Sequence, residues 1–180
     1  MKSHILKAVA LVPVLLIGLA CTNHTSPTAS ADDNTYKDSV KQALQQAELQ
    51  DVTVDEDRAK NTITLSGKVH SDNARREAGE VAKAAAGERI IANEISVQPV
   101  GAESEAKDIA SDRDTAIEKN YKASLTAQGL DKQHINFDAK NGVLTLKGRV
   151  KTPSERSRAE QLAQATPNVR QVLNQIDVSR

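Results

Sequence analysis

Few side chains in this chain of 180 residues have the type and spacing that covalent or metal chemistry requires. There is one cysteine, Cys21, and the four histidines are His4, His24, His70 and His134. No cluster of histidine, cysteine and carboxylate residues has the spacing of a metal-ligand set. The run 55–57, Asp-Glu-Asp, lacks the glycine and the closing glutamate of a calcium loop, so we interpret it as a solvated turn.

Motifs for enzymatic chemistry are also missing from the sequence. It contains no nucleophile elbow, phosphate-binding loop or dinucleotide fingerprint, and we therefore expect no enzymatic activity, no cofactor and no metal. Lys and Arg number 24, as do Asp and Glu, so the formal net charge is zero and nothing favours nucleic acid as a partner. Aromatic residues make up only 2%, which predicts a thin core of Val, Ile, Leu and Ala.

Cys21 follows a segment that is typical of an export signal. Lys2 and Lys7 precede an uncharged, mostly apolar run over 8–20, which has the length of a signal-peptide core and is too short to cross a bilayer comfortably. The small residues Gly18 and Ala20 favour cleavage after Ala20. Cleavage there would make Cys21 the new N-terminal residue.

An unpaired thiol at the N-terminus of an exported protein would be open to oxidation, and attachment of a diacylglycerol to its sulfur removes that liability. The run 16–21, Leu-Ile-Gly-Leu-Ala-Cys, resembles the lipobox of bacterial lipoproteins, with Gly18 where a leucine is usual. We predict lipidation at Cys21; the alternative is a soluble periplasmic protein. Thr22 is not the aspartate that resembles an inner-membrane retention signal, so we expect the inner leaflet of the outer membrane, facing the periplasm.

The rest of the chain is a tandem duplication. The run 64–69, Thr-Leu-Ser-Gly-Lys-Val, recurs at 145–150 as Thr-Leu-Lys-Gly-Arg-Val. The same offset matches these further pairs without a gap: Leu44 and Leu125, Leu49 and Leu130, Arg75 and Arg156, Ala78 and Ala159, Ala82 and Ala163, Asn93 and Asn174, Ile95 and Ile176, Val97 and Val178. We expect a signal peptide at 1–20, the lipidated cysteine and a flexible tether at 21–34, modules at 35–98 and 112–180, and a linker at 99–111.

Each copy predicts the element order α-β-β-α-β. Apolar residues at helical spacing predict a helix at the start of each copy, followed by two short strands joined by a turn. A second helix begins at Ser71 in the first copy and at Thr152 in the second. A last strand closes each copy at 91–97 and 172–178. Because a crossover makes the second and third strands parallel, we expect an α+β fold of two modules. Each module is then a three-stranded mixed sheet with two helices on one face and water on the other.

Two repeated residue types inside these elements need an explanation. Gly67 and Gly148 fall in register with the buried positions of the second strand, which predicts close approach of a helix or of backbone; the alternative is a ligand that touches the glycine backbone. Asn93 and Asn174 lie near the start of the last strand, where we expect their amides to bond to nearby backbone.

These repeated motifs are similar to those of the BON (bacterial OsmY and nodulation) domain. The resemblance rests on Leu-x-Gly-x-Val, on the Arg- and Ala-rich helix after it, and on the closing run 172–178, Val-x-Asn-x-Ile-x-Val. The first copy departs from it at 87–89, Gly-Glu-Arg. Together with the export signal, the arrangement resembles outer-membrane lipoproteins with two BON domains. The resemblance implies a protein without enzymatic activity that binds phospholipid and supports envelope integrity.

Soluble relatives imply an alternative, which is a membrane-tethered periplasmic stress or chaperone-like module that binds envelope proteins and not lipid. For the lipid hypothesis, the contact we expect is Tyr121 with Lys119 and Lys122 beside it, because a tyrosine flanked by lysines suits a headgroup boundary. Phe137 could mark the same surface. The competing interpretation is that Tyr121 is a core residue, since it stands at helical spacing from Ile117 and Leu125.

Overall fold

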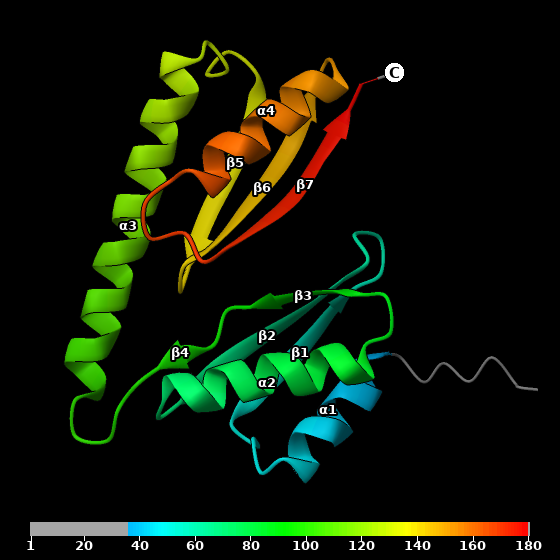
Figure 1. Cartoon of the computed structure of the whole chain (residues 1–180), viewed down its shortest axis with the longest axis vertical. Coiled ribbons are helices and arrows are strands. Elements are labelled where there is room, and N and C mark those ends of the chain that lie inside the picture. Colours follow the sequence, from blue (N-terminus) through cyan, green and yellow to red (C-terminus); the bar gives the residue numbers. More distant parts are fainter. Residues whose placement is uncertain (1–35, 180) are drawn as a thin grey trace, which may run out of the picture. The chain divides into compact units, whose positions relative to one another are not determined.

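The computed structural model describes residues 36–179, which belong to one compact unit. Our predictions for the export signal, Cys21 and the tether fall outside the described residues. The first module consists of α1 (Tyr36–Gln46), β1 (Val52–Asp57), β2 (Thr62–Val69), α2 (Asp72–Ala85), β3 (Ile90–Asn93) and β4 (Ser96–Val97). The second consists of α3 (Glu103–Ala127), β5 (His134–Lys140), β6 (Val143–Val150), α4 (Pro153–Gln164) and β7 (Gln171–Val178) (Figure 1).

Each module has its own mixed sheet. In the first, β2 pairs antiparallel with β1 and parallel with β3 and β4; in the second, β6 pairs antiparallel with β5 and parallel with β7. The helices of each module contribute to the core on one face of its sheet (Figure 1). The prediction of an α+β fold with two tandem mixed-sheet modules is therefore confirmed. One detail differs, because the strand expected at 91–97 is divided into β3 and β4.

The helix α3 is longer than the repeat requires. It begins at Glu103, inside the segment that we assign to the linker, and runs to Ala127. Its buried residues Ile117, Tyr121 and Leu125 all lie in the C-terminal half, which belongs to the second core. The linker is therefore largely helical. The N-terminal half of α3 is not part of the second module's core, whereas its C-terminal half is.

Both cores are built from aliphatic side chains, as the composition predicts. The first contains Val40 and Leu44 from α1, Ala78 and Ala82 from α2, and Ile63 and Leu65 from β2. The second contains Ile117, Tyr121 and Leu125 from α3, Ala159 and Ala163 from α4, and Leu144 and Leu146 from β6. The small residues on α2 and α4 let these helices lie close to their sheets.

Local sequence signals fix the ends of several elements. Thr152 caps α4, with its side chain accepting from the Glu155 N–H, and the Glu155 carboxylate accepts from the Thr152 N–H, a complete capping box. Asn141 and Gly142 both have positive φ, 47° and 79°, which is the geometry that an Asn-Gly hairpin turn requires. In both copies the asparagine of the last strand accepts a backbone N–H two residues later, as predicted.

The repeated glycines confirm the close approach of backbone and correct its direction. Gly67 and Gly148 have φ of +108° and +112°, a region in which side chains are strained. A Cβ at these positions would collide with the carbonyl oxygens of Asp51 and His134 on the neighbouring strand side. Gly67 is exposed and does not lie under a helix, so our placement of it on the buried face is wrong. The neighbouring strand, not the core, requires glycine here.

The outward faces of the sheets are not entirely wet, which corrects a second expectation. Thr62, Ala92, Val143, Thr145 and Leu173 lie on these faces and are buried. The two modules bond to each other along this side. The side-chain amide of Gln171 donates to the carbonyl of Ile91 (2.6 Å) and accepts from the N–H of Asn93 (3.3 Å). Nearby, Asn141 donates to the carbonyl of Glu94 (2.8 Å), and Lys140 pairs with the Glu94 carboxylate (2.9 Å).

Candidate functional site

Tyr121, the centre of the predicted lipid contact, is completely buried. Its hydroxyl donates to the carbonyl of Ala159 on α4 (3.2 Å), and its ring meets that of Phe137 edge to face with centroids 5.0 Å apart. Burial raises the pKa of the hydroxyl, because the anion would lose its hydration. The interpretation of Tyr121 as a core residue is confirmed, and its spacing from Ile117 and Leu125 was the signal for it.

Lys119 and Lys122 lie on α3 with exposed side chains. The structure therefore does not gather the three predicted residues on one surface, because Tyr121 points into the core while both lysines face solvent. Phe137 joins Tyr121 in the core. Whether the two lysines contact lipid stays a prediction.

A groove that the sequence analysis did not predict lies beside the N-terminal half of α3. It has a volume of about 390 Å³. Its apolar lining residues are Val97, Pro99, Ala106, Ile109 and Ala110. Its charged and polar lining residues are Arg75 from α2, Arg113 from α3 and Arg170 from the segment before β7, along with Asp72, Asp114 and Asn141. These residues are far apart in the sequence, and no short motif contains them.

The carboxylates of this groove already have partners. Asp72 pairs with Arg75 (2.6 Å). Asp114 accepts the backbone N–H groups of Asn141 (2.6 Å) and Gly142 (2.8 Å), so it holds the β5–β6 turn. Within residues 36–179, neither Arg113 nor Arg170 makes an ion pair or a side-chain hydrogen bond. The groove therefore presents two guanidinium groups that are available to an anion.

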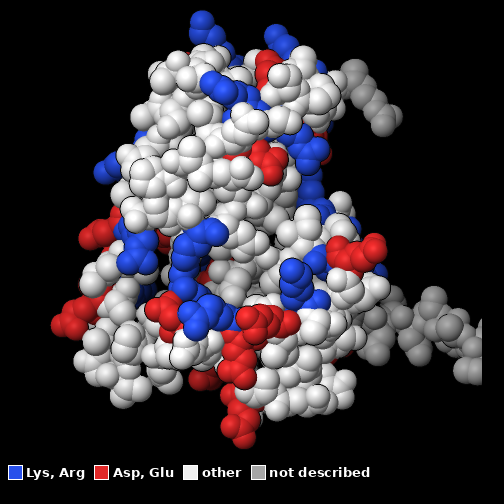
Figure 2. All heavy atoms as spheres, viewed as in Figure 1, with Lys and Arg blue, Asp and Glu red and all other residues white. Residues whose placement is uncertain are grey.

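Large apolar side chains are exposed at the same place. Ile109 lines the groove and is 59% exposed, and Val100, next to the lining residue Pro99, is 79% exposed. Exposed apolar groups beside unpaired arginines form an amphipathic surface of the kind that marks an interaction site. On the face drawn in Figure 2, Lys and Arg gather across the middle of the view with Asp and Glu beside them. Charges of both signs are therefore mixed on this face of the molecule.

The acidic run 55–57 is part of β1 and not a solvated turn, which corrects our interpretation. Its residues alternate across the sheet, so Asp55 and Asp57 are exposed while the Glu56 side chain is only 4% exposed. The Glu56 carboxylate lies 3.3 Å from Arg89, whose guanidinium stacks on the ring of Tyr36 (4.8 Å to the centroid). Glu56 accepts no hydrogen bond within the described residues. In the second module, Phe137 occupies the matching position.

Within residues 36–179 we find neither a cluster of three or more metal-ligating side chains nor a helix that is long and apolar enough to cross a membrane. The described residues form two small modules of one α+β type, each with its own mixed sheet. The sequence matches the BON domain twice, over residues 32–99 and 113–180, and the chain belongs to the BON domain family.

A curated relative supports this assignment. The Osmotically-inducible protein Y of Escherichia coli (strain K12) is 31% identical over 149 residues, which cover 81% of this chain and 72% of the relative. Two solved structures of CdsD, a structural protein of the type III secretion system of Chlamydia trachomatis, align at TM-scores of 0.34 and 0.35. They share 11% and 12% identity, and the alignments cover 79% of this chain and 96% and 91% of those chains. A likeness this distant says nothing about function here.

Proposed function

We propose that this chain is an envelope protein of the osmotic-stress type without enzymatic activity. In this proposal it is exported to the periplasm, anchored through a lipid on Cys21 to the outer membrane, and binds phospholipid through its folded unit. The signal-like segment, the lipobox-like run and the kinship with an osmotically inducible protein support the location. The observation that carries the lipid assignment is the groove beside α3, where Ile109 is exposed next to unpaired Arg113 and Arg170.

The two kinds of lining residue match the two parts of an anionic phospholipid. Guanidinium groups bind phosphate oxygens with paired hydrogen bonds, and the apolar lining residues suit the upper part of an acyl chain. Lys119 and Lys122 lie further along the same helix, about 120° and about 180° around its axis from Arg113, so they would be a separate contact on another face of α3. The proposal therefore keeps α3 as the lipid-facing helix and moves the centre of contact from Tyr121 to Ile109 and Arg113.

The expected strength of this contact explains why an anchor would be needed. Partial burial of two apolar side chains contributes about 1 kcal/mol each, and each arginine near an anionic surface contributes about 1 kcal/mol. The sum of about 4 kcal/mol corresponds to a dissociation constant near 1 mM. A short tether gives an effective concentration in the millimolar range, so an anchored unit would bind the membrane about half of the time.

Vesicle co-sedimentation of residues 21–180 with the substitution Cys21→Ser tests this proposal, because that segment contains the whole compact unit and has no acylation site. We expect binding to phosphatidylglycerol vesicles at millimolar lipid, and weaker binding to phosphatidylcholine or at high salt. The variant Ile109→Ser/Arg113→Gln should abolish the difference between the lipids. Lys41→Gln on α1 is the control for loss of one exposed charge.

Two other results would change the conclusion. If Lys119→Gln/Lys122→Gln abolishes binding and the groove variant does not, the contact is at the site predicted from sequence. If no lipid composition binds the unanchored chain, the phospholipid proposal is wrong. The competing proposal, a membrane-tethered stress or chaperone-like module that binds envelope proteins, is then favoured.

A further inference from the structure

A second and larger groove lies on the outward face of the sheet β5-β6-β7. Its volume is about 760 Å³. The basic residues that line it are His134 on β5, Lys147 and Arg149 on β6, Lys151 just after β6, and Lys60 from the β1–β2 hairpin of the first module. It shares no residue with the groove beside α3, so the two surfaces can be tested separately.

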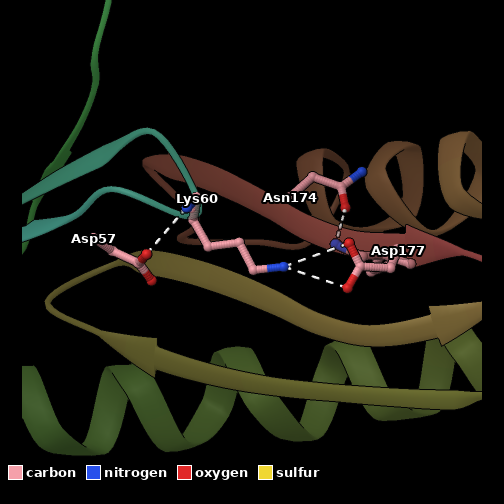
Figure 3. A network of polar contacts seen from close by, with 5 residues as sticks. Asp57, Lys60, Asn174 and Asp177 are labelled. Carbon is pink, nitrogen blue, oxygen red and sulfur yellow. Dashed lines mark hydrogen bonds and ion pairs between the residues drawn. The ribbon is translucent and has the colours of Figure 1, made fainter.

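The acidic residues of this groove are already engaged. Asp177 on β7 accepts the Lys60 ammonium at 3.4 Å from each of its oxygens, and Figure 3 shows Lys60 extending from the β1–β2 hairpin to reach it. Asp57 accepts the backbone N–H of Lys60 (3.0 Å). The side chains of Lys147, Arg149 and Lys151 have no ion pair or hydrogen bond with any residue that the structure describes. The groove therefore has three cationic side chains that no carboxylate contacts directly, and the carboxylate of Asp177, opposite Arg149 in the β6–β7 register, is engaged by Lys60.

These three groups form a row. Lys147 and Arg149 are alternate residues of one strand and both line the groove, which places them roughly 7 Å apart along β6. Lys151 continues the row beyond the strand, and His134 lies directly opposite Arg149 in the register. Charges at such intervals along a line suit an extended anion that carries several negative groups, and they suit a single small anion less well.

The row is a feature of the second copy alone. By the repeat offset, Lys147 replaces Ser66, Arg149 replaces Lys68 and Lys151 replaces His70. The matching strand positions of the first copy fold in the same way without this concentration of charge. The fold therefore does not require these cations. Because like charges side by side repel one another, we infer that the row serves binding.

We propose that this groove binds a linear polyanion whose charges are phosphate groups. Lysine and arginine are the side chains that bind phosphate oxygens best, and the concave surface can enclose a thin chain. A flat array of lipid headgroups would not follow the groove, so the occupant is a soluble phosphate polymer and not a bilayer. This inference does not depend on the proposed lipid contact at α3.

The test is calorimetric titration of the full chain, purified in a neutral detergent, with a short inorganic polyphosphate. We expect saturable binding that weakens as salt increases, and no measurable binding of orthophosphate at the same phosphate concentration. The variant Lys147→Gln/Arg149→Gln should bind about tenfold more weakly, because two exposed charge contacts are lost. Lys68→Gln, which changes the first-copy counterpart of Arg149, is the matched control and should bind as the parent does.

Three results would overturn the proposal: no binding of polyphosphate, equal affinity of the parent and the Lys147→Gln/Arg149→Gln variant, or orthophosphate binding as tightly as the polymer. Sedimentation with phosphatidylglycerol vesicles separates the two possible sources of phosphate. If this variant loses vesicle binding, the groove is a membrane contact and the assignment to a soluble polymer is wrong. Unchanged vesicle binding with weakened polyphosphate binding supports the proposal and leaves the α3 contact to its own test.

Discussion

The ion pair inside the first module gives the sharpest test of the packing described above. The Glu56 side chain is 4% exposed, its two oxygens accept no hydrogen bond within the described residues, and Arg89 at 3.3 Å is the cation beside it. The substitution Arg89→Leu would leave the carboxylate buried without a counter-charge. It would also remove the stacking of the guanidinium on Tyr36.

The expected cost is large for a single substitution. Removal of one partner of a buried ion pair costs about 3–5 kcal/mol, because the remaining charge has lost its hydration and gains nothing in exchange. Loss of the cation–π contact adds about 0.5–1 kcal/mol at a partly exposed site. Replacement of both charges by apolar groups is often neutral or stabilising. The second module shows such a solution, with Phe137 at the position that matches Glu56.

Urea unfolding followed by far-ultraviolet circular dichroism measures these differences. We expect Arg89→Leu to lower the free energy of unfolding by about 3.5–6 kcal/mol, and the double variant Glu56→Phe/Arg89→Leu to recover most of that loss. Val40 is smaller than Tyr121, its counterpart in the second copy, so we expect the core to accommodate the added ring. If Arg89→Leu costs less than about 1 kcal/mol, the value of an exposed pair, then Glu56 is not isolated from water and the reasoning is wrong. A double variant no more stable than Arg89→Leu would refute the steric part of the argument.

Three further predictions concern the second module. A strained φ alone costs about 1 kcal/mol, and Gly148→Ala should destabilise the chain several times more than that, because its Cβ would meet the His134 carbonyl. Gly129→Ala, with φ of +67° and open space around it, should show the cost of the strain alone. Equal losses of unfolding free energy in the two variants would refute the clash. Thr152→Ala should lower the unfolding free energy by about 1 kcal/mol through loss of the helix cap, measured by urea titration, while an unchanged midpoint would show that the capping box contributes nothing. The raised pKa of Tyr121 stabilises the folded chain at pH values below the usual tyrosine pKa near 10, and this contribution is lost as pH rises through the folded pKa. Tyr121→Phe should therefore lose less stability than the parent between neutral and strongly alkaline pH. Parallel curves of unfolding free energy against pH would contradict this expectation.

The duplication made most of the fold predictable from sequence. Signals that are ambiguous in one copy, such as the helix start at Ser71, are explicit in the other, where Thr152 and Glu155 form a capping box. Strand alternation located β2 and β6, and the Asn-Gly pair located the hairpin turn. These features depend on neighbours along the chain, and local chemistry is sufficient to define them.

Features that depend on distant contacts were not predictable. The burial of Thr62 and Leu173 on the outward faces needs the other module in each case, and no pattern within one strand indicates it. The acidic run 55–57 favours a solvated turn on sequence grounds, because a charged side chain is rarely buried without a partner. Glu56 is buried beside Arg89, which lies in a distant part of the chain. The groove beside α3 combines residues of α2, α3 and the β5–β6 turn, so its composition appears only after folding.

Comparison of the two copies suggests where function lies in this chain. Positions that agree, such as Gly67 with Gly148 and Asn93 with Asn174, have the same backbone roles in both modules, so the fold explains them. Where the copies differ at exposed positions, the fold tolerates both residues and does not explain the choice. The cationic row on β6 is such a difference, and the exposed half of α3 before Ile117 is an element that the shared module does not need. Substitutions at these places should therefore change binding while leaving stability nearly unchanged, whereas substitutions at the shared positions should do the reverse.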